Sequence, residues 1–255
     1  KVDDILSLLL PRLVPIANTD SVPLPHARGR ILARDLTAQV SAPPCDRSAM
    51  DGYAFRLGEK GPLRLAGRAR AGKPFDGMVR PGECVAVATG ASLPRGCDTV
   101  AMHEHCDVTK AGVIVCAKGE GANVRRRGED FQAGALLLKS GACLGARQIG
   151  LLAAAGVECV TVYRPLRIAL LSMGDELNGA GPDGIRDANR PMLQAICAAN
   201  NLQMTDLGVL PDNRARLTET LAHAATRHDV VITSAGTSAG DEDHLLGAML
   251  DCGGH

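Results

Sequence analysis

Three segments rich in carboxylates, hydroxyls and glycine each follow a run of apolar residues with the composition of a β-strand. They are Ser172-Met173-Gly174-Asp175-Glu176, Pro211-Asp212-Asn213 and Ser234-Ala235-Gly236-Thr237-Ser238-Ala239-Gly240-Asp241-Glu242-Asp243. Small residues let main-chain N–H groups approach an anion closely, and a following helix adds a partial positive charge, which suits a phosphate. Carboxylates would repel that phosphate unless a hard divalent cation lies between them, so the combination indicates Mg²⁺ shared by protein and substrate oxygens.

The last third of the chain contains the elements that must position these segments. Strand-like RIALLS, LQMTDLGV and DVVITS alternate with helix-like ANRPMLQAICAANN and NRARLTETLAHAATR, and a further helix begins near the end. This rhythm predicts an α/β fold with a parallel sheet, helices on both faces and right-handed crossovers. Because ligands bind beyond the carboxyl ends of such strands, we expect the three segments at one edge. Each alone is more readily explained as a helix cap or turn, but three at one edge favour a binding site.

The preceding part of the chain has a different pattern. Helical spacing over residues 2–14 ends at Pro11, and from about 50 to 140 short β-like runs alternate with turns that contain Gly or Pro. We expect a small all-β module there, barrel-like or a sandwich, then a helix over 145–156 closed by Gly156 and a strand stopped by Pro165. The predicted domains are therefore 1–164, with the β module inserted at about 50–140, and an α/β ligand-binding domain at 165–255.

Composition narrows the classes of partner and the compartment. Lys+Arg 28 and Asp+Glu 28 balance, and aromatic residues make up 2%, so neither a basic field nor a stacking platform predicts nucleic-acid binding. No apolar stretch is long enough for a membrane span. Nine scattered cysteines without a C-x-x-C pair favour buried thiols in a reducing cytosol over disulfides or a metal site. We therefore expect a cytoplasmic protein that binds neither nucleic acid nor membrane.

Two familiar enzyme classes are disfavoured. Gly236 to Gly240 fit the G-x-S-x-G pattern of a nucleophile elbow, but only His244, Asp251 and His255 follow, with no further strand to carry the acid and the histidine. The neighbouring carboxylates would also oppose an oxyanion. A dinucleotide-dependent dehydrogenase is disfavoured because no G-x-G-x-x-G follows a strand.

Three further polar strings lie in the N-terminal half. SAMDGYA at 48–54 contains an Asp that packing would not demand, Thr89-Gly90-Ala91 ends a predicted strand, and NVRRRGED at 123–130 sets three arginines beside two carboxylates. Arginines can clamp an oxyanion in a bidentate manner, yet a charged run of this kind is more often a solvated loop that pairs with itself.

Six strings in this order resemble the MoeA family of molybdopterin molybdenumtransferases, which is related to the E domain of gephyrin. They are SAMDGYA at 48–54, ATGASLPRGCDTV at 88–100, NVRRRGED at 123–130, RIALLSMGDEL at 167–177, GIRDANR at 184–190 and DVVITSAGTSAGDEDH at 229–244. The resemblance implies a homodimer that binds adenylylated molybdopterin and molybdate, inserts molybdenum and hydrolyses the adenylate with Mg²⁺. It implies a molybdopterin adenylyltransferase upstream, apo-molybdoenzymes downstream, and a site between the sheet domain of one subunit and the β module region of the other.

Carried over by motif, the catalytic residues are Asp51, Thr89, Asp130, Glu176, Asp212 and Asp243. Glu176, Asp212 and Asp243 are then the expected metal ligands, which agrees with the reasoning from the strand ends; that reasoning did not predict Asp51, Thr89 or Asp130. The expected substrate-binding residues are Gly174, Asp175, Ser234, Gly236, Thr237, Ser238, Gly240, Arg125, Arg126 and Arg127. Asp51 and Asp130 would shape the pocket for the dithiolene or molybdate, and metal or arginine would neutralise the acids.

The chain also departs from the family pattern. Met173, Ala235 and Asn213 stand where the family usually has Thr, Gly and Asp, and each removes one polar or main-chain option. The chain starts at Lys1 and ends at His255, without the Lys- and Pro-Gly-rich segment and C-terminal β domain that the family adds. Two alternatives stay open: a non-catalytic molybdopterin-binding scaffold, which would bind pterin without hydrolysing adenylate, and a molybdopterin adenylyltransferase, against which the N-terminal β module argues.

Overall fold

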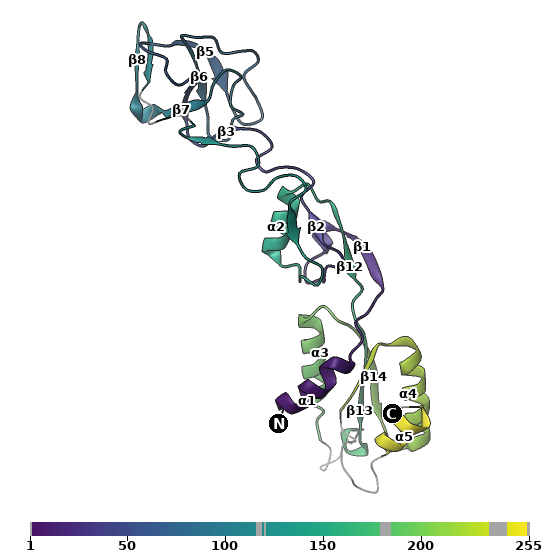
Figure 1. Ribbon diagram of the computed structural model, residues 1–255. Coiled ribbons are helices and arrows are strands. Elements are labelled where there is room, and N and C mark those ends of the chain that lie inside the picture. Colours follow the sequence, from purple (N-terminus) through teal and green to yellow (C-terminus); the bar gives the residue numbers. More distant parts are fainter. Residues whose placement is uncertain (1, 116–118, 120, 179–184, 235–243, 254–255) are drawn as a thin grey trace. The chain divides into compact units, whose positions relative to one another are not determined.

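The chain divides into two compact units in a computed structural model (Figure 1). Unit 1 comprises residues 1–34, 141–145 and 160–255, and unit 2 comprises 35–140 and 146–159. The structure describes residues 2–115, 119, 121–178, 185–234 and 244–253. In that part of the chain no helix is long and apolar enough to cross a membrane. The predicted boundary at 164/165 stays a prediction.

A three-stranded parallel sheet lies at the centre of the α/β part of unit 1. Its strands are β13 (Arg167–Met173), β14 (Gln203–Leu210) and β15 (Val230–Ser234), in the order β14-β13-β15. Residues 168–173 of the central strand are buried, as expected for a strand covered on both faces. The predicted alternation of strands and helices is confirmed.

Helices cover both faces of this sheet (Figure 1). α3 (Asn189–Ala199) lies on one side, and α4 (Arg214–Arg227) and α5 (Leu245–Asp251) lie on the other. Side chains alternate along a strand, so Leu171 and Met173 point to the same face, where they pack with Leu217 of α4 in one hydrophobic cluster. Asn213 begins α4: its side-chain oxygen accepts the Arg216 N–H at 3.0 Å.

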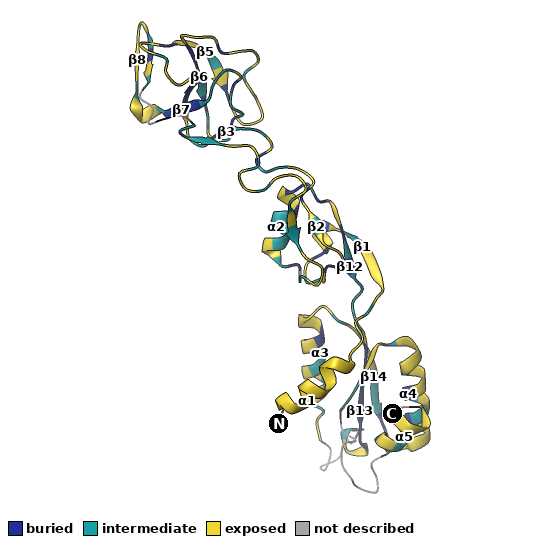
Figure 2. Ribbon diagram, viewed as in Figure 1, coloured by how far each residue is buried: buried dark blue, intermediate teal, exposed yellow. Residues whose placement is uncertain are grey.

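The remainder of unit 1 holds short elements. α1 (Val2–Leu9) continues into a 3₁₀ turn, η1 (Leu10–Arg12), which contains the predicted helix breaker Pro11. β1 (Thr19–Pro23) pairs with β12 (Cys159–Tyr163), and η2 (Leu24–His26) follows β1. α1 is exposed along its whole length (Figure 2).

Unit 2 contains a four-stranded sheet in the order β5-β6-β4-β7. Its strands are β4 (Gly52–Phe55), β5 (Arg64–Ala69), β6 (Glu83–Val87) and β7 (Thr99–Met102), and β8 (Cys106–Thr109) and β9 (Gly112–Val115) form a hairpin after η3 (His103–His105). β4 is buried on both faces because a separate apolar cluster packs on each. The all-β character is confirmed, but the barrel-like closure is not, since among the described strands β5 and β7 end the sheet as edges.

Short pairings complete unit 2. β2 (Leu36–Thr37) pairs with β11 (Leu136–Leu138), and β3 (Arg47–Ser48) pairs with β10 (Val124–Arg125). α2 (Ala146–Ala154) confirms the predicted helix, and Gly156 follows it with a φ of 81°. That left-handed conformation is the usual way in which a glycine closes a helix.

Candidate functional site

The turns after β13 and β14 meet at the carboxyl edge of the parallel sheet. The Gly174 N–H donates to the Leu210 carbonyl at 3.2 Å, and the Asp175 N–H donates to Oδ2 of Asp212 at 3.4 Å. The strand ends are in register, with Met173 opposite Leu210. The structure therefore brings together two of the three segments predicted to form the site.

Gly174 shapes the first of these turns. Its φ of 128° lies in a region that side chains rarely adopt, and a Cβ built on it would lie against the carboxylate of Glu176. Glu176 belongs to the 3₁₀ turn η4 (Asp175–Asn178) and, like Asp212, is exposed. Glycine at position 174 thus lets the Glu176 carboxylate fold back toward the strand end.

The third predicted segment follows β15, and most of it lies outside the described residues. This applies to Gly236, Thr237, Ser238, Gly240 and Asp243, and also to the departure at Ala235. Ser234, the last residue of β15, is described. It is 9% exposed, and its hydroxyl accepts a hydrogen bond from the Asn189 side chain at 3.0 Å.

The donor set at this edge is compatible with a hard divalent cation. Glu176 and Asp212 supply two carboxylates on neighbouring turns, and oxygen ligands are what Mg²⁺ prefers. The described residues contain no group of three His, Cys, Asp or Glu side chains that could hold a metal ion. The third expected ligand, Asp243, lies outside them, so the described part accounts for two ligands of the expected three.

Two polar residues at this edge were not predicted as site residues. Asp187 accepts the Ser172 hydroxyl at 2.5 Å and the Arg190 N–H at 3.0 Å, and Asn189 donates to Ser234. The hydrogen bond from Ser172 is the main cause that holds the pKa of the Asp187 carboxyl below its usual value, and burial works in the opposite direction. The available signal was their place at the start of a predicted helix, since Asp187 precedes that helix and Asn189 lies in its first turn, where polar residues often cap or anchor a helix.

In unit 2, Asp51 and Thr89 lie together. Oδ1 of Asp51 accepts the Thr89 N–H at 2.6 Å and the Thr89 hydroxyl at 2.9 Å. The main-chain bond, then the hydroxyl bond, lower the pKa of Asp51, which is exposed. Gly90, with a φ of 79°, makes the tight turn after Thr89, and its N–H donates to the Ser48 carbonyl at 2.8 Å.

The arginine-rich string is paired with acids. Nη2 of Arg125 donates to Asp130 at 2.5 Å, and Nη1 of Arg126 donates to Asp46 at 2.8 Å. Asp46 also accepts the Arg127 N–H at 2.8 Å. Residues 125–130 thus form a loop with ion pairs inside it, as the sequence favoured. Asp46 is a further partner that the sequence did not indicate. The expected roles of Arg125, Arg126, Arg127 and Asp130 toward an oxyanion stay predictions.

Two of the three departures from the family pattern have a structural role here. Met173 is 4% exposed and packs in the hydrophobic cluster under α4 and α5. Asn213 caps α4 through its side-chain oxygen. Both residues therefore stabilise the elements that carry Glu176 and Asp212.

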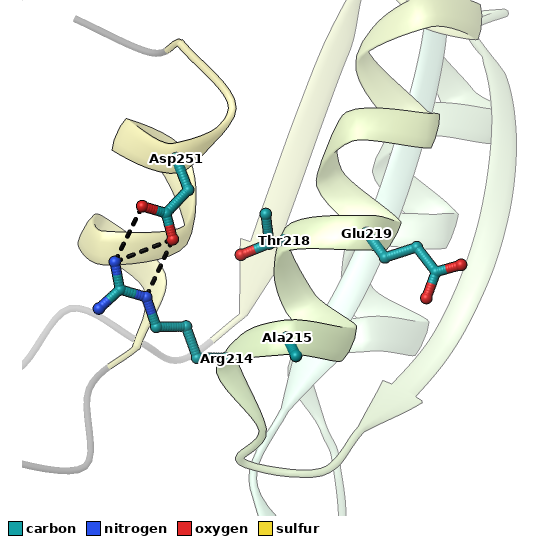
Figure 3. A pocket seen from close by; sticks show the side chains of 5 residues that line it. All are labelled: Arg214, Ala215, Thr218, Glu219 and Asp251. Carbon is teal, nitrogen blue, oxygen red and sulfur yellow. Dashed lines mark hydrogen bonds and ion pairs between the residues drawn. The ribbon is translucent and has the colours of Figure 1, made fainter.

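A separate pocket lies between α4 and α5 (Figure 3). It is lined by Arg214, Ala215, Thr218, Glu219 and Asp251, none of which is a predicted site residue. The Arg214 guanidinium donates to both carboxylate oxygens of Asp251, at 2.8 and 2.9 Å from Nη2. Its charge is neutralised there, so this pocket offers little attraction for an anion.

These features define a class of protein, in which an α/β ligand-binding domain with a carboxylate-bearing sheet edge shares one chain with a β-rich unit. A family model described as "MoeA N-terminal region (domain I and II)" matches residues 1–156, and one described as "Probable molybdopterin binding domain" matches residues 169–255. The chain belongs to the MoeA family.

Individual relatives agree with this assignment. A "Molybdopterin molybdenumtransferase" of Haemophilus influenzae is 36% identical over 99% of this chain and 65% of its own length, and one of Nostoc sp. is 34% identical over 95% and 58%. "Gephyrin" of Dictyostelium discoideum is 29% identical over 98% of this chain and 40% of its own length. The chain thus spans about two thirds or less of these relatives.

A solved structure has the same fold. The molybdopterin biosynthesis moeA protein of Pyrococcus horikoshii OT3 superposes with a TM-score of 0.82 at 28% sequence identity, over 91% of this chain and 65% of that one. The match extends over both the β-rich and the α/β parts, as the two family models do.

Proposed function

We propose that the protein inserts molybdenum from molybdate into adenylylated molybdopterin, with hydrolysis of the adenylate and release of AMP. The observation that carries the proposal is the convergence of the turns after β13 and β14, joined by the hydrogen bond from Asp175 to Asp212. Ligands of open parallel sheets bind at this edge, and relatives of this chain are named molybdopterin molybdenumtransferases.

In this proposal the sheet edge binds the adenylate end of the substrate. Glu176 and Asp212, together with Asp243, would hold Mg²⁺, and a bound Mg²⁺ would neutralise the pyrophosphate oxygens. Main-chain donors of the segment from Gly236 to Gly240 would bind the same oxygens, whereas the N–H groups of Gly174 and Asp175 hold the edge together by donating to Leu210 and Asp212. Ser234 would hold the start of that segment through its hydrogen bond with Asn189.

Residues of unit 2 would contribute to the pocket for the dithiolene and molybdate. Thr89 orients the Asp51 carboxylate through two hydrogen bonds, so this carboxylate would present a fixed acceptor. Asp130 and Arg125 form an ion pair, in which the guanidinium offsets the acid next to an incoming dianion. The ion pair would reduce the repulsion between Asp130 and molybdate, and a cation would have to offset the charge of Asp51.

The wider assignments belong to the same proposal. We expect a cytoplasmic homodimer that receives its substrate from a molybdopterin adenylyltransferase and supplies apo-molybdoenzymes. Light scattering of the full-length protein, together with its sedimentation, would measure the oligomeric state.

Substitution of a sheet-edge carboxylate tests the proposal. The full-length protein is incubated with adenylylated molybdopterin, molybdate and Mg²⁺, and AMP release is followed over time. Asp212→Asn should lower the rate at least about a hundredfold because a metal ligand and its charge are lost. Glu219→Gln, which removes an exposed carboxylate from α4 outside the site, is the matched control and should not change the rate. Equal rates for both variants would contradict the proposal.

A further inference from the structure

The segment of residues 185–190 contacts all three strands of the parallel sheet. Asp187 accepts the hydroxyl of Ser172 on β13, and Asn189 donates to the hydroxyl of Ser234 on β15. Arg190 donates through Nε to Asp206 on β14 at 3.0 Å. The contacts to Ser172 and Ser234 lie beside the edge that carries Glu176 and Asp212.

The two serines that the segment contacts lie near the carboxyl ends of their strands. Ser172 is opposite Ser234 in the parallel register of β13 and β15, and they are 0% and 9% exposed. A buried hydroxyl needs a hydrogen-bond partner, and here each partner comes from the same short segment. Asp187 and Asn189 therefore fix the segment across two neighbouring strands.

The segment also holds the turn that carries Glu176. The N–H of Ile185 donates to the main-chain carbonyl of Glu176 at 3.0 Å. A shift of residues 185–190 would remove this bond and release the η4 turn on one side. The same shift would leave Ser234, where the segment leading to Asp243 begins, without the Asn189 donor.

We propose that Asp187 and Asn189 are positioning residues, which hold the Glu176 turn and the end of β15 in place for the adenylate. The inference rests on the proposed function, since it names the adenylate as the ligand of the positioned edge. Asp187 acts through its two acceptor oxygens, one on Ser172 and one on the Arg190 N–H, and its negative charge is not itself required.

This last point separates positioning from catalysis. In Asp187→Asn the amide oxygen can still accept the Arg190 N–H and the amide nitrogen can donate to the Ser172 oxygen, so both bonds survive without the charge. Asp187→Ala loses both. In the same way Asn189→Asp can accept a hydrogen bond from the Ser234 hydroxyl, whereas Asn189→Ala cannot form one.

The test measures kcat and KM for AMP release, the Kd for adenylylated molybdopterin, and amide hydrogen exchange at Ile185 and Arg190 in the full-length protein. Asp187→Ala should lose about 10- to 100-fold in kcat/KM, because it loses two hydrogen bonds worth about fivefold each and leaves the buried Ser172 hydroxyl without its acceptor. In this variant the main-chain amides of Ile185 and Arg190 should exchange faster than in the wild type. Asp187→Asn should keep kcat/KM within about threefold of the wild type, with the amides of Ile185 and Arg190 still protected. Asn189→Ala should likewise lose activity, and Asn189→Asp should retain it.

Gln194→Ala is the matched control, because Gln194 joins α3 to Asp206 without contacting either serine. If Asp187→Ala fails to fold, Ser172→Ala removes one of the two bonds and should give a smaller loss with the same pattern. The inference is overturned if Asp187→Asn loses activity as Asp187→Ala does while both amides stay protected, since the charge would then be needed. It is equally overturned if Asp187→Ala keeps its activity and protection.

A failure of the proposed function gives a different result. In that case the wild type itself releases no AMP. The amide exchange rates and the Kd for adenylylated molybdopterin then test by themselves whether Asp187 and Asn189 position the edge. Faster exchange and weaker binding in Asp187→Ala, both restored in Asp187→Asn, would support it. Unchanged exchange and binding in Asp187→Ala would overturn it.

Discussion

Asp51 accepts two hydrogen bonds from Thr89 through a single carboxylate oxygen, one from the main-chain N–H and one from the hydroxyl. The two residues are 38 positions apart in the chain, and the main-chain bond is the larger cause of the lowered Asp51 pKa. Thr89→Ala removes only the hydroxyl bond. The pKa of Asp51 should therefore rise part of the way toward its usual value, and Thr89→Ser should keep it low.

Carbon-detected NMR of the Asp51 carboxyl as a function of pH measures this pKa directly. The order expected is wild type equal to Thr89→Ser, both below Thr89→Ala. An Asp51 pKa that does not respond to Thr89→Ala would show that the hydroxyl bond does not hold the carboxylate in solution.

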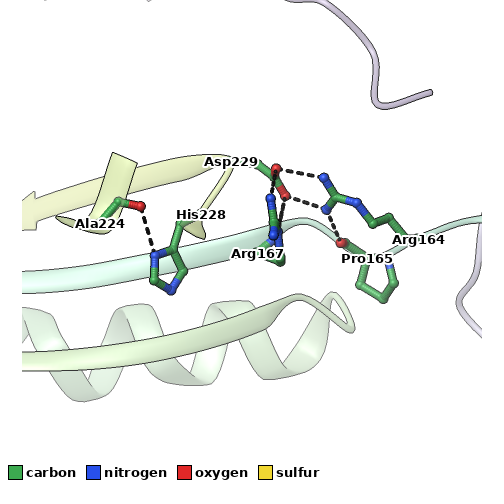
Figure 4. A network of polar contacts seen from close by, with 6 residues as sticks. All are labelled: Arg164, Pro165, Arg167, Ala224, His228 and Asp229. Carbon is green, nitrogen blue, oxygen red and sulfur yellow. Dashed lines mark hydrogen bonds and ion pairs between the residues drawn. The ribbon is translucent and has the colours of Figure 1, made fainter. Parts of the chain in front are cut away.

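Asp229 at the start of the sheet is predicted to make stability depend on pH. It accepts hydrogen bonds from Arg164 and from the main chain and side chain of Arg167, which lower its pKa far below the usual range (Figure 4). A carboxyl whose pKa is depressed on folding stabilises the protein above its unfolded pKa of about 3.9, and this contribution is lost as the pH falls further.

Asp229→Asn should thus destabilise the protein by about 1–2 kcal/mol at pH 7, and by less near pH 3. Urea unfolding at several pH values measures the difference. A destabilisation that grows as the pH falls would contradict the assignment, because it has the opposite sign.

The glycine at 174 leads to a third prediction. In Gly174→Ala the new Cβ meets the Glu176 carboxylate, and a side chain is forced into a φ of 128°. We expect a loss of about 1–2 kcal/mol in the free energy of unfolding and a larger fractional loss of AMP release, because Glu176, the proposed metal ligand, is displaced. Gly150→Ala in α2 is a suitable control, since a Cβ there meets nothing within 4 Å. Equal effects of the two substitutions would argue against a special role of Gly174.

The cysteines should differ in reactivity. Burial raises the pKa of the Cys84 thiol to about 11 and that of Cys97 to about 12, whereas Cys143, Cys159 and Cys252 are exposed. Because the thiolate is the reactive form, a disulfide reagent at pH 8 should label Cys143, Cys159 and Cys252 before Cys84 and Cys97. Mass spectrometry of the labelled peptides measures the order. Early labelling of Cys84 or Cys97 in the folded protein would contradict this packing.

The sequence predicted the sheet edge well, for a physical reason. The apolar runs were long and separated by clear helical patterns, and the rule for the carboxyl ends of parallel strands then placed Glu176 and Asp212 together. The contact between Asp51 and Thr89 could not be derived in this way. It joins two turns of a β-rich unit whose strand pairing depends on long-range packing, and only the resemblance to a family indicated both residues.

Other contacts of the candidate site could be recognised only from the three-dimensional structure. The pairing of Arg126 and the Arg127 N–H with Asp46 spans about 80 residues of sequence, so a local charge pattern could not reveal it. Asp187 and Asn189 lay in a string that already resembled the family, yet their partners Ser172 and Ser234 become neighbours only through the strand register. The expected barrel was not confirmed because the composition of short strands does not fix whether a sheet closes.

The measurement that tests the central claim most directly is AMP release together with the activation of an apo-molybdoenzyme by the full-length protein. It is supplied with adenylylated molybdopterin, molybdate and Mg²⁺. We predict that both products appear in the wild type and that Asp243→Asn abolishes both while the protein keeps its fold and oligomeric state. Tight binding of the pterin without AMP release or activation would contradict the account and would describe a carrier or scaffold.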